Sequence, residues 1–247
     1  MPPKFDLKFV IIIPARYKSS RFPGKPLVQI KGKSLIQRVW EKCCLAMSSS
    51  DVYIATDDKR IQQHCEELGM QVVMTSENCL TGTDRVFEAS QQVGADIYIN
   101  VQGDEPLIDP NDITQVMQES SRVPLSIVNA MCPIQKEADF RSLSIPKVVT
   151  RMDGRLLYMS RAAIPTTKES HYITANKQVC IYAFPKKCLA DFVSVVKKTP
   201  MEVIEDIEIL RFLELGYEVN MINVSSASIA VDFPEDVKKV ENALSNE

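Results

Sequence analysis

Phe9-Val-Ile-Ile-Ile13 is followed directly by the loop Pro14-Ala-Arg-Tyr-Lys-Ser-Ser-Arg-Phe-Pro-Gly-Lys-Pro-Leu27. The apolar run predicts a buried strand. The loop places four cations close together with no acid among them: Arg16, Lys18, Arg21 and Lys25. Arginine and lysine bind phosphate, and ligands of open α/β sheets lie at the carboxyl ends of strands. The stretch therefore favours a polyphosphate site, and the alternative is a solvated basic loop.

The composition is that of an ordinary soluble protein. Hydrophobic residues make up 45% of the 247 residues and charged residues 25%, which is enough for a sizeable core. Because no linker or repeat is visible, we expect one domain over residues 1–247. The formal net charge of −3 gives no global field that would recruit nucleic acid or an anionic membrane. The charged N-terminus precedes an apolar run too short to span a bilayer, so we expect a cytoplasmic protein.

Cysteine and histidine usage limits the metal chemistry. The seven cysteines are odd in number and form no Cys-x-x-Cys pair, which indicates neither a disulfide framework nor a zinc site. Several lie at apolar positions, as small buried side chains do in a reducing compartment. With only His64 and His171, a histidine-rich centre is excluded. A metal ion would be held by carboxylates, which favours Mg²⁺.

The first half of the chain alternates strands with helices, the pattern of βαβ units and a parallel sheet. Strands are expected at 9–13, 52–55, 71–75 and 96–101, and helices are expected to begin in a capping box at Ser34 and Gln37, to end near Gly69, and to begin at Thr83 and Pro110. The second half is less regular, with strands expected at 125–131, 147–151, 177–184 and 218–224 and helices at 204–215 and 234–244. Polar residues 160–176 predict a loop or an excursion within an embedded subregion of roughly 132–200. The predicted fold class is α/β, with a mostly parallel sheet and helices on both faces.

Two familiar phosphate motifs are absent. Gly32-Lys33-Ser34 has the tail of a Walker A loop, but Leu27 stands where that motif needs its first glycine. The Gly-x-Gly-x-x-Gly pattern of dinucleotide-binding proteins does not occur either. The sequence therefore argues against P-loop enzymes and the usual dinucleotide oxidoreductases.

Two acidic loops follow predicted strands. Val101-Gln-Gly-Asp-Glu-Pro106 places Asp104 at a strand end as a candidate metal ligand, with Glu105 in support. The alternative is an ordinary turn. Val231-Asp-Phe-Pro-Glu-Asp236 places Asp232 similarly, and its alternative is an acidic helix start.

A third loop, Thr81-Gly-Thr-Asp-Arg85, opens a predicted helix. Gly82 allows close backbone approach, and the free N–H groups of a helix N-terminus bind anions, so a base or a sugar carboxylate is expected there. The alternative is that Thr83 is a plain helix cap. Because all these loops follow strands of one sheet, they are expected to converge. Cations in one and carboxylates in two others are what metal-assisted chemistry on a nucleoside triphosphate requires.

These motifs, taken in order, resemble the 3-deoxy-manno-octulosonate cytidylyltransferases (CMP-KDO synthetases). The resemblance rests on Ile13–Leu27, Ala55-Thr-Asp57, Met74-Thr75, Thr81–Arg85, Asn100–Pro106, Lys147-Val-Val149, Tyr158-Met-Ser-Arg161-x-x-Ile-Pro165, Ile181-Tyr182 and Val231–Asp236. It covers residues 9 to about 244 and is most specific in the first 110 residues. The related sialic acid synthetases have a different Gly-Ser-Lys pattern in their first loop.

The resemblance implies a Rossmann-like nucleotide-diphospho-sugar-transferase sheet that activates a 2-keto-3-deoxy sugar acid with CTP and Mg²⁺, for lipopolysaccharide or capsule synthesis. It assigns Arg16, Arg21 and Lys25 to the triphosphate, with Arg16, Lys25 and Asp104 as catalytic residues, and Asp104 and Asp232 to the metal. Cytosine and ribose are assigned to Pro14, Ala15, Thr81, Gly82, Thr83 and Arg85, and the sugar acid to Gln102, Arg161, Gln178, Tyr182 and Glu208. Family members are typically homodimers, joined partly through Ser160–Pro165.

Two departures fall in the implied sugar pocket. The family's Arg-His before Gly-Ile-Tyr is replaced by Lys177-Gln178 before Val-Cys-Ile-Tyr182, and Ile209 replaces a glutamine. One hypothesis is a differently substituted acceptor, such as a deoxy, amino (8-amino-KDO), or nine-carbon (KDN or sialic-type) acid; the other is drift within a KDO enzyme. A non-catalytic nucleotide-binding regulator predicts loss of a cation or a carboxylate, and none is lost. A glycosyltransferase predicts an Asp-x-Asp motif, which is not seen.

Overall fold

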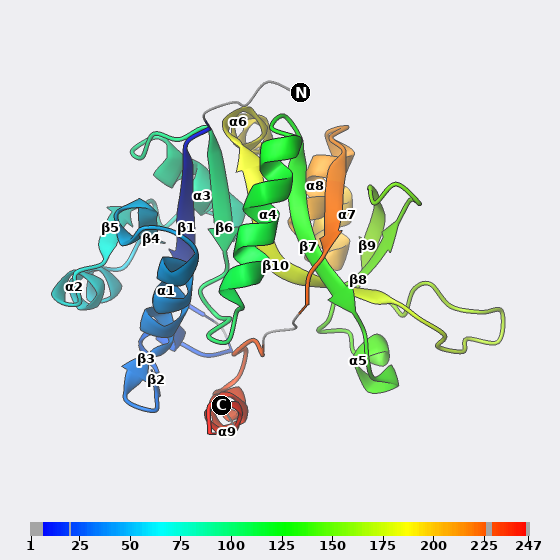
Figure 1. Ribbon diagram of the computed structural model, residues 1–247, viewed down its shortest axis with the longest axis horizontal. Helices are drawn as coiled ribbons and strands as arrows, with labels where there is room; N and C mark the ends of the chain where they lie inside the picture. Colours follow the sequence, from blue (N-terminus) through cyan, green and yellow to red (C-terminus); the bar gives the residue numbers. More distant parts are fainter. Residues whose placement is uncertain (1–6, 20, 226–228, 246–247) are drawn as a thin grey trace.

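The computed structural model describes residues 7–19, 21–225 and 229–245, so the charged N-terminal segment before Leu7 lies outside the described residues. A nine-stranded sheet runs through the described part of the chain in the order β11-β7-β10-β6-β1-β4-β5, with β8 and β9 branching from the start of β10 (Figure 1). The strands are β1 Phe9–Ala15, β4 Val52–Thr56, β5 Gln71–Met74, β6 Ile97–Val101, β7 Ile127–Pro133, β8 Lys147–Thr150, β9 Leu156–Ser160, β10 Asn176–Pro185 and β11 Val219–Asn223.

The predicted parallel sheet is confirmed for its first half. Strands β6, β1, β4 and β5 are parallel to one another. Strand β10 runs antiparallel to both β6 and β7, whereas β11 is parallel to β7. The chain enters β10 from the excursion formed by residues 161–175, which lies at the carboxyl edge of the parallel strands, so β10 has to run back across the sheet (Figure 1). The sheet is therefore mostly parallel with one reversed strand in its middle.

Helices cover both faces, as expected. Alternate residues of β1 are buried on opposite sides, with Ile11 and Ile13 in one core and Val10 and Ile12 in the other. Helices α1, α2 and α4 pack on the first side and α3, α6 and α8 on the second, while α9 packs against the small hairpin of β2 and β3 (Figure 1). The remaining bounds are β2 Gln29–Ile30, β3 Lys33–Ser34, α1 Leu35–Ala46, α2 Lys59–Glu67, α3 Gly82–Ser90, α4 Pro110–Arg122, α5 Glu137–Arg141, α6 Lys186–Ser194, α7 Pro200–Glu205, α8 Ile209–Glu214 and α9 Pro234–Ala243.

Two predicted helix starts need correction. Ser34 caps α1 by accepting from the Gln37 N–H, but the Gln37 amide donates to Glu41, so the capping box is only half formed. Helix α3 is capped by Thr81 rather than Thr83. The side chain of Thr81 accepts from the N–H of Asp84, whose carboxylate accepts from the N–H of Thr81 in return. That reciprocal pair satisfies two backbone donors, so the helix starts two residues earlier in the chain than predicted.

The single helix predicted over residues 204–215 is wrong. The structure has two short helices, α7 and α8, separated by a turn at Asp206 in the left-handed conformation (φ 50°). Strand β9, helices α5 and α6 and the β2–β3 hairpin have no counterpart among the predicted elements. The predicted excursion is confirmed, because residues 161–175 project from the edge of the molecule between β9 and β10 (Figure 1).

The structure also describes the state of the cysteines and the apolar character of the helices. All seven cysteines are free thiols. Among the described residues, no helix has the length and apolar character needed to cross a bilayer.

Candidate active site

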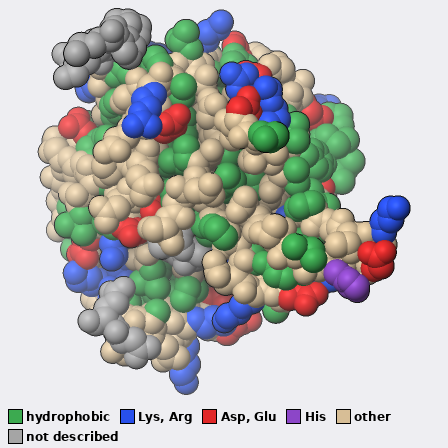
Figure 2. Space-filling model, turned by 45° about the vertical axis from the view of Figure 1, so that its right-hand side comes forward, with side chains coloured by type: hydrophobic (Ala, Val, Ile, Leu, Met, Phe, Trp, Pro, Cys, Tyr) green, Lys and Arg blue, Asp and Glu red, His purple; other side chains and the backbone are tan. Residues whose placement is uncertain are grey.

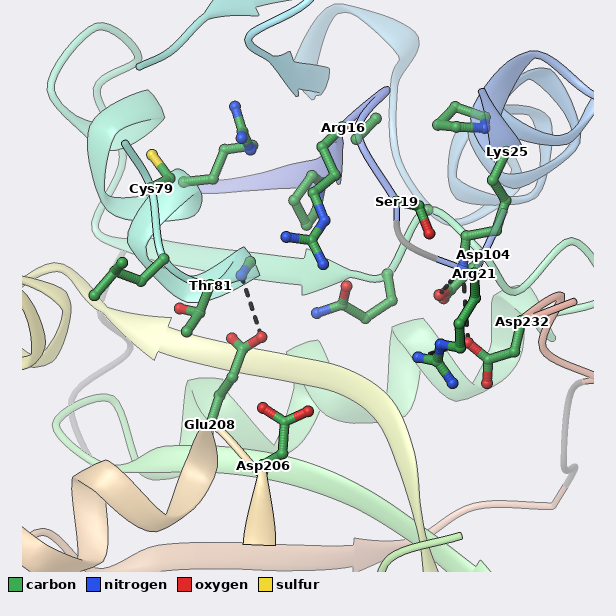
Figure 3. Close-up of a pocket in the computed structure, with 18 of the residues that line it drawn as sticks. Arg16, Ser19, Arg21, Lys25, Cys79, Thr81, Asp104, Asp206, Glu208 and Asp232 are labelled. Atoms are coloured by element: carbon green, nitrogen blue, oxygen red, sulfur yellow. Dashed lines mark hydrogen bonds and ion pairs between the residues drawn. The ribbon is translucent and has the colours of Figure 1, made fainter. Parts of the chain in front are cut away.

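A cavity of about 240 Å³ opens at the carboxyl edge of the parallel strands (Figure 3). The loops after β1, β5 and β6 line it, together with the segment before α9 and the turn between α7 and α8. The lining residues are Pro14, Ala15, Arg16, Ser19, Arg21, Lys25, Pro26, Cys79, Leu80, Thr81, Gly82, Arg85, Gln102, Gly103, Asp104, Lys198, Asp206, Glu208 and Asp232. The four segments singled out in the sequence thus meet at one place. Three of them follow β1, β5 and β6, but Asp232 lies nine residues beyond the end of β11 and just before α9, so its predicted place at a strand end is wrong.

The basic loop is folded back on itself by Tyr17. Gly24 adopts a φ of 73° and donates its N–H to the Tyr17 carbonyl at 2.9 Å. A Cβ at residue 24 would lie 3.1 Å from the Tyr17 ring, so glycine suits both the conformation and the contact. The Arg60 guanidinium lies over the Tyr17 ring, 3.3 Å from its centroid. The loop therefore has a defined shape in which Lys25 begins a short 3₁₀ turn.

Lys25 lies between the two predicted metal carboxylates. Its Nζ is 2.8 Å from Asp104 Oδ2 and 3.9 Å from Asp232 Oδ1. Arg21 reaches the same Asp232 oxygen at 3.4 Å (Figure 3). The exposed fractions of the three inner side chains are 16% for Lys25, 29% for Asp104 and 34% for Asp232. The carboxylates are thus balanced by cations yet remain accessible from the cavity.

Backbone contacts bring these two acids together. A Cβ on residue 103 would lie 2.9 Å from the Pro14 carbonyl oxygen, so only glycine lets the loop after β6 approach the loop after β1 this closely. The Asp104 carbonyl in turn accepts a hydrogen bond from the Val231 N–H at 2.9 Å. This bond places Asp232, more than a hundred residues along the chain, beside Asp104.

The two carboxylates form a small donor set. Among the described residues, no cluster of three or more aspartate, glutamate, histidine or cysteine side chains would ligate a metal. Mg²⁺ is usually bound by one or two carboxylates, with substrate phosphates and water completing its octahedron. Asp104 and Asp232 fit that pattern, and Lys25 shows that a cation is favourable between them.

The N-terminus of α3 is already occupied, which corrects the expectation of free N–H groups. The Glu208 carboxylate accepts from the N–H of Gly82 at 3.1 Å and from the N–H and hydroxyl of Thr83 at 2.8 and 2.6 Å (Figure 3). A carboxylate is favoured at this end of a helix dipole. An external anion would have to displace Glu208, so this loop offers a ligand its side chains and shape rather than free backbone donors.

Arg85 and Gln102 are placed in the cavity wall. Arg85 is buried and contacts Asp57 at 3.5 Å and the Thr75 hydroxyl. The Gln102 backbone N–H donates to the Cys180 carbonyl at 3.4 Å, and the residue lines the cavity. Arg16 also lines it, from the opening of the basic loop (Figure 3).

Arg161 is not among the residues that line the cavity, contrary to the site implied by the resemblance. Its Nε donates to the Glu205 carbonyl at 2.6 Å and its other nitrogens donate to the carbonyls of Leu143, Ser144 and Asp206 at 3.0–3.3 Å. A guanidinium has five donors, and four are used in this way. Arg161 therefore holds the turn between α7 and α8 and positions Asp206 through the backbone carbonyl of that residue.

The side chain of Glu205 also ties this turn to the end of β9. Its carboxylate accepts from the Ser160 hydroxyl at 2.6 Å, the Arg161 N–H at 2.8 Å and the Tyr158 hydroxyl at 3.3 Å. Burial raises the pKa of Glu205, but these three hydrogen bonds outweigh burial and hold it below its ordinary value. The ionised carboxylate is thus the form that the fold stabilises.

Glu205→Gln is expected to destabilise the protein in a pH-dependent way. Because the folded-state pKa is lowered, the stabilisation is fully present above the unfolded pKa of 4.5 and is lost as the pH falls through the folded value. Urea unfolding at pH 7, 5 and 4 should show a gap between wild type and variant that narrows toward acid. The exposed Glu235→Gln is the control. A gap of constant size would mean that the charge of Glu205 is irrelevant.

Tyr182 and Gln178 lie outside the cavity lining. The two flank a bulge in β10, between Val179 and Tyr182. Asn129 spans that bulge by donating to the carbonyls of Val179 and Ile181 at 3.0 and 2.9 Å, and its oxygen accepts from the Gln178 amide at 3.0 Å. Burial raises the pKa of Tyr182 well above its ordinary value, so its hydroxyl stays protonated. Gln178 therefore helps to hold Asn129 in the position from which it bonds the backbone of β10.

Glu105 lies behind Asp104 and is buried. Burial and the charge of Asp104 raise its pKa to about 7, against the opposing hydrogen bonds of Cys180. The structure thus gives Glu105 and Asp104 different surroundings, with only Asp104 reaching the cavity.

Several cavity residues were not identified from the sequence. Ser19 lies within the quoted loop but was given no role, and Cys79 and Leu80 precede the α3 cap. Lys198 and Asp206 come from the region of α7 and form an ion pair at 2.7 Å. The only signal for Asp206 was its place in a helical pattern, which the structure interrupts there.

Comparison with known proteins places these features in a family. Residues 10–222 match the family model described as cytidylyltransferase. The chain is 39% identical to the 3-deoxy-manno-octulosonate cytidylyltransferase of Protochlamydia amoebophila, over 94% of this chain and 93% of that protein. It is 40% identical to the 8-amino-3,8-dideoxy-manno-octulosonate cytidylyltransferase of Shewanella halifaxensis, over 96% and 99%.

A solved structure agrees with these sequence matches. The CMP:2-keto-3-deoxy-manno-octonic acid synthetase complexed with CTP superposes with a TM-score of 0.88 at 36% identity, covering 97% of this chain and 99% of that one. The chain therefore belongs to the cytidylyltransferase family, and the family predicted from the motifs is confirmed. It is a CTP-dependent nucleotidyltransferase by this membership.

Proposed function

We propose that this protein transfers the cytidylyl group of CTP to a 2-keto-3-deoxy sugar acid, 3-deoxy-manno-octulosonate in the first instance, to give a CMP-sugar and pyrophosphate. The observation that carries the proposal is the position of Lys25, at 2.8 Å from Asp104 and 3.9 Å from Asp232, in a cavity that also contains Arg16 and Arg21. Cations for a triphosphate and carboxylates for a metal thus meet at one point.

The two substrates are assigned to different walls of the cavity. The triphosphate lies against Arg16, Arg21 and Lys25, and the nucleoside lies along Pro14 and Ala15 and the start of α3. The acceptor lies toward Asp206 and Glu208, on the side of the cavity where Glu208 contacts the start of α3 below Thr81 (Figure 3). The reacting atoms then meet near Gln102 and Asp104.

In this arrangement the anomeric hydroxyl of the sugar attacks the α-phosphorus in line. An O–P bond forms to the sugar as the hydroxyl proton is lost to solvent, the bond from the α-phosphorus to the bridging oxygen breaks, and pyrophosphate leaves with the electron pair. Arg16, Arg21 and Lys25 stabilise the charge that gathers on the leaving group. We propose Mg²⁺ on Asp104 and Asp232, where it would lower the pKa of the attacking hydroxyl and neutralise phosphate charge. Lys25 would exchange its contact with Asp104 for phosphate oxygen.

The identity of the acceptor is the finer part of the proposal. Relatives named for 3-deoxy-manno-octulosonate and for its 8-amino derivative are equally similar to this chain, at 39% and 40% identity. Gln178 and Ile209, the two residues that differ from the family pattern, do not line the cavity. Gln178 is hydrogen-bonded to Asn129 and Ile209 is buried, so these substitutions favour sequence drift within a 3-deoxy-manno-octulosonate enzyme over a change of acceptor.

A pyrophosphate-release assay with CTP, Mg²⁺ and a panel of ulosonic acids tests this choice. We expect 3-deoxy-manno-octulosonate to give the highest kcat/KM. A higher value for the 8-amino derivative or a nine-carbon acid would reassign the acceptor. Release with none of the acids would contradict the proposed transfer and favour a non-catalytic regulator.

We also propose that the protein acts as a homodimer in the cytoplasm, where its seven free thiols would persist. Leu157, Met201 and Ile204 are exposed on neighbouring β9 and α7, beside the Ser160–Pro165 segment. Figure 2 shows this flank, with hydrophobic side chains above the protruding loop. An apolar patch of this kind is typical of an interface between subunits.

Leu157→Glu is expected to shift the sedimentation of the protein from dimer to monomer, because a carboxylate cannot be desolvated in an apolar contact. Leu125→Glu, at an exposed leucine elsewhere, should leave the dimer intact. Sedimentation of the wild type as a monomer at all concentrations would contradict the proposal.

A further inference from the structure

Most of the arginine and lysine side chains that line the cavity already have a proposed role or a buried partner. Arg16, Arg21 and Lys25 come from the basic loop, and Arg85 is buried against Asp57 and Thr75. Among the described residues that line the cavity, the remaining lysine or arginine is Lys198. It comes from the segment between α6 and α7, and its partner Asp206 lies on the acceptor wall (Figure 3).

Without Lys198 the acceptor wall would repel an anion. It presents two carboxylates, Asp206 and Glu208, to a substrate that is itself an acid. The charge of Glu208 is offset by the N-terminus of α3, from which it accepts three hydrogen bonds. The charge of Asp206 is offset by Lys198, whose Nζ donates to Oδ1 at 2.7 Å and helps to lower the pKa of Asp206.

The Lys198–Asp206 pair is placed to exchange partners. Asp206 is 72% exposed and Lys198 29%, so the pair is largely solvated on one side and contributes little to the stability of the fold. An ammonium group has three donor hydrogens, and one is used by Asp206. Lys198 can therefore contact a ligand carboxylate without leaving a buried charge unpaired.

The arginine that the family resemblance assigns to the sugar acid does not reach this place. Four of the donors of Arg161 point to the backbone carbonyls of Leu143, Ser144, Glu205 and Asp206. Its role is to hold the turn that carries Asp206. A direct contact with the acceptor from this wall has to come from another cation.

We propose that Lys198 binds the carboxylate of the acceptor sugar and thereby selects acidic acceptors, an inference that rests on the proposed cytidylyl transfer. Asp206 holds the ammonium group in place until the acceptor arrives and competes with the acceptor for it. Lys198 is thus a specificity-determining residue for the sugar, separate from the cations that bind the triphosphate.

Steady-state kinetics of Lys198→Met with pyrophosphate release as readout tests the proposal. The acceptors are 3-deoxy-manno-octulosonate and its C1 carboxamide, which has the same shape without the charge. We expect the KM for the acid to rise about tenfold or more, as for loss of a hydrogen bond to a charged group. The KM for CTP should stay within about twofold, and the preference for acid over carboxamide should largely disappear.

Two further variants sharpen the test. Lys197→Met removes a neighbouring exposed lysine that does not line the cavity, and it should leave both KM values unchanged. Asp206→Asn removes the competing carboxylate, so the KM for the acid should fall. Matching urea midpoints would show that the variants are folded.

The outcomes separate this inference from the proposed function. An unchanged KM for the acid in Lys198→Met, or a rise confined to CTP, overturns the role of Lys198 while leaving the transfer reaction standing. If the wild type releases no pyrophosphate, the proposed function fails by itself. Calorimetric titration of wild type and Lys198→Met with the sugar acid then decides the matter, because equal affinities would overturn the inference and weaker binding by the variant would support it.

Discussion

Asp104→Asn is expected to lower kcat by about 10²–10³-fold, the scale on which removal of one preorganised electrostatic contact acts. The amide keeps the shape of the side chain but removes the charge that lies 2.8 Å from Lys25 and that we assign to Mg²⁺. Pyrophosphate release at saturating CTP, acceptor and Mg²⁺ measures the loss. The Mg²⁺ concentration for half-maximal activity should rise as well.

The fold should survive this change, because the Asp104 side chain is 29% exposed and faces the cavity. An unfolding midpoint close to that of the wild type is therefore part of the expected result. Asp153→Asn, at an exposed turn between β8 and β9, is the matched control and should retain full activity. Activity of Asp104→Asn within a few-fold of wild type would remove Asp104 from the reaction.

The second large effect is on stability. Arg211 and Glu202 are both 0% exposed and form a two-pronged pair, with Nε to Oε2 at 2.6 Å and the other nitrogen to Oε1 at 2.8 Å. The guanidinium also lies 3.7 Å from the centre of the Phe192 ring and 3.4 Å from Asp84. Arg211→Met would leave the buried Glu202 carboxylate without a charged partner, with the Thr199 N–H still donating to it. We expect the free energy of unfolding to fall by about 3–5 kcal/mol.

Urea unfolding of Arg211→Met measures this loss, and a double variant isolates its cause. Arg211→Met with Glu202→Leu removes both charges and should recover much of the lost stability, because a buried ion pair is often replaceable by apolar side chains. A loss below about 1 kcal/mol in the single variant would show that Glu202 finds water or another donor.

The part of the fold that sequence could predict is the part with local signals. Strand β1 is apolar on both faces because it lies between two cores, and that pattern is visible in Phe9–Ile13. The parallel arrangement of β1, β4, β5 and β6 then places the loops that follow these strands at one edge. That geometric consequence is why Lys25 and Asp104 could be expected in one site without knowing the contacts between them.

The remainder depends on contacts between distant residues. The apolar spacing across residues 204–213 is continuous, yet the helix breaks at Asp206 because Arg161, 45 residues earlier in the chain, binds its carbonyl. Glu208 caps α3 from more than 120 residues away. No local pattern predicts either contact. The family resemblance therefore assigned Arg161 to the sugar pocket, and the motif at Thr81–Arg85 predicted free N–H groups at the start of α3.

The central claim is that one cavity joins CTP to a sugar acid, and ³¹P NMR of a reaction mixture tests it most directly. With CTP, Mg²⁺ and 3-deoxy-manno-octulosonate, we expect the three CTP signals to be replaced by one phosphodiester signal and one pyrophosphate signal, from products formed in equimolar amounts. Without the acceptor, the CTP signals should remain. Unchanged CTP with every ulosonic acid, or its breakdown to CDP and phosphate, would contradict the account.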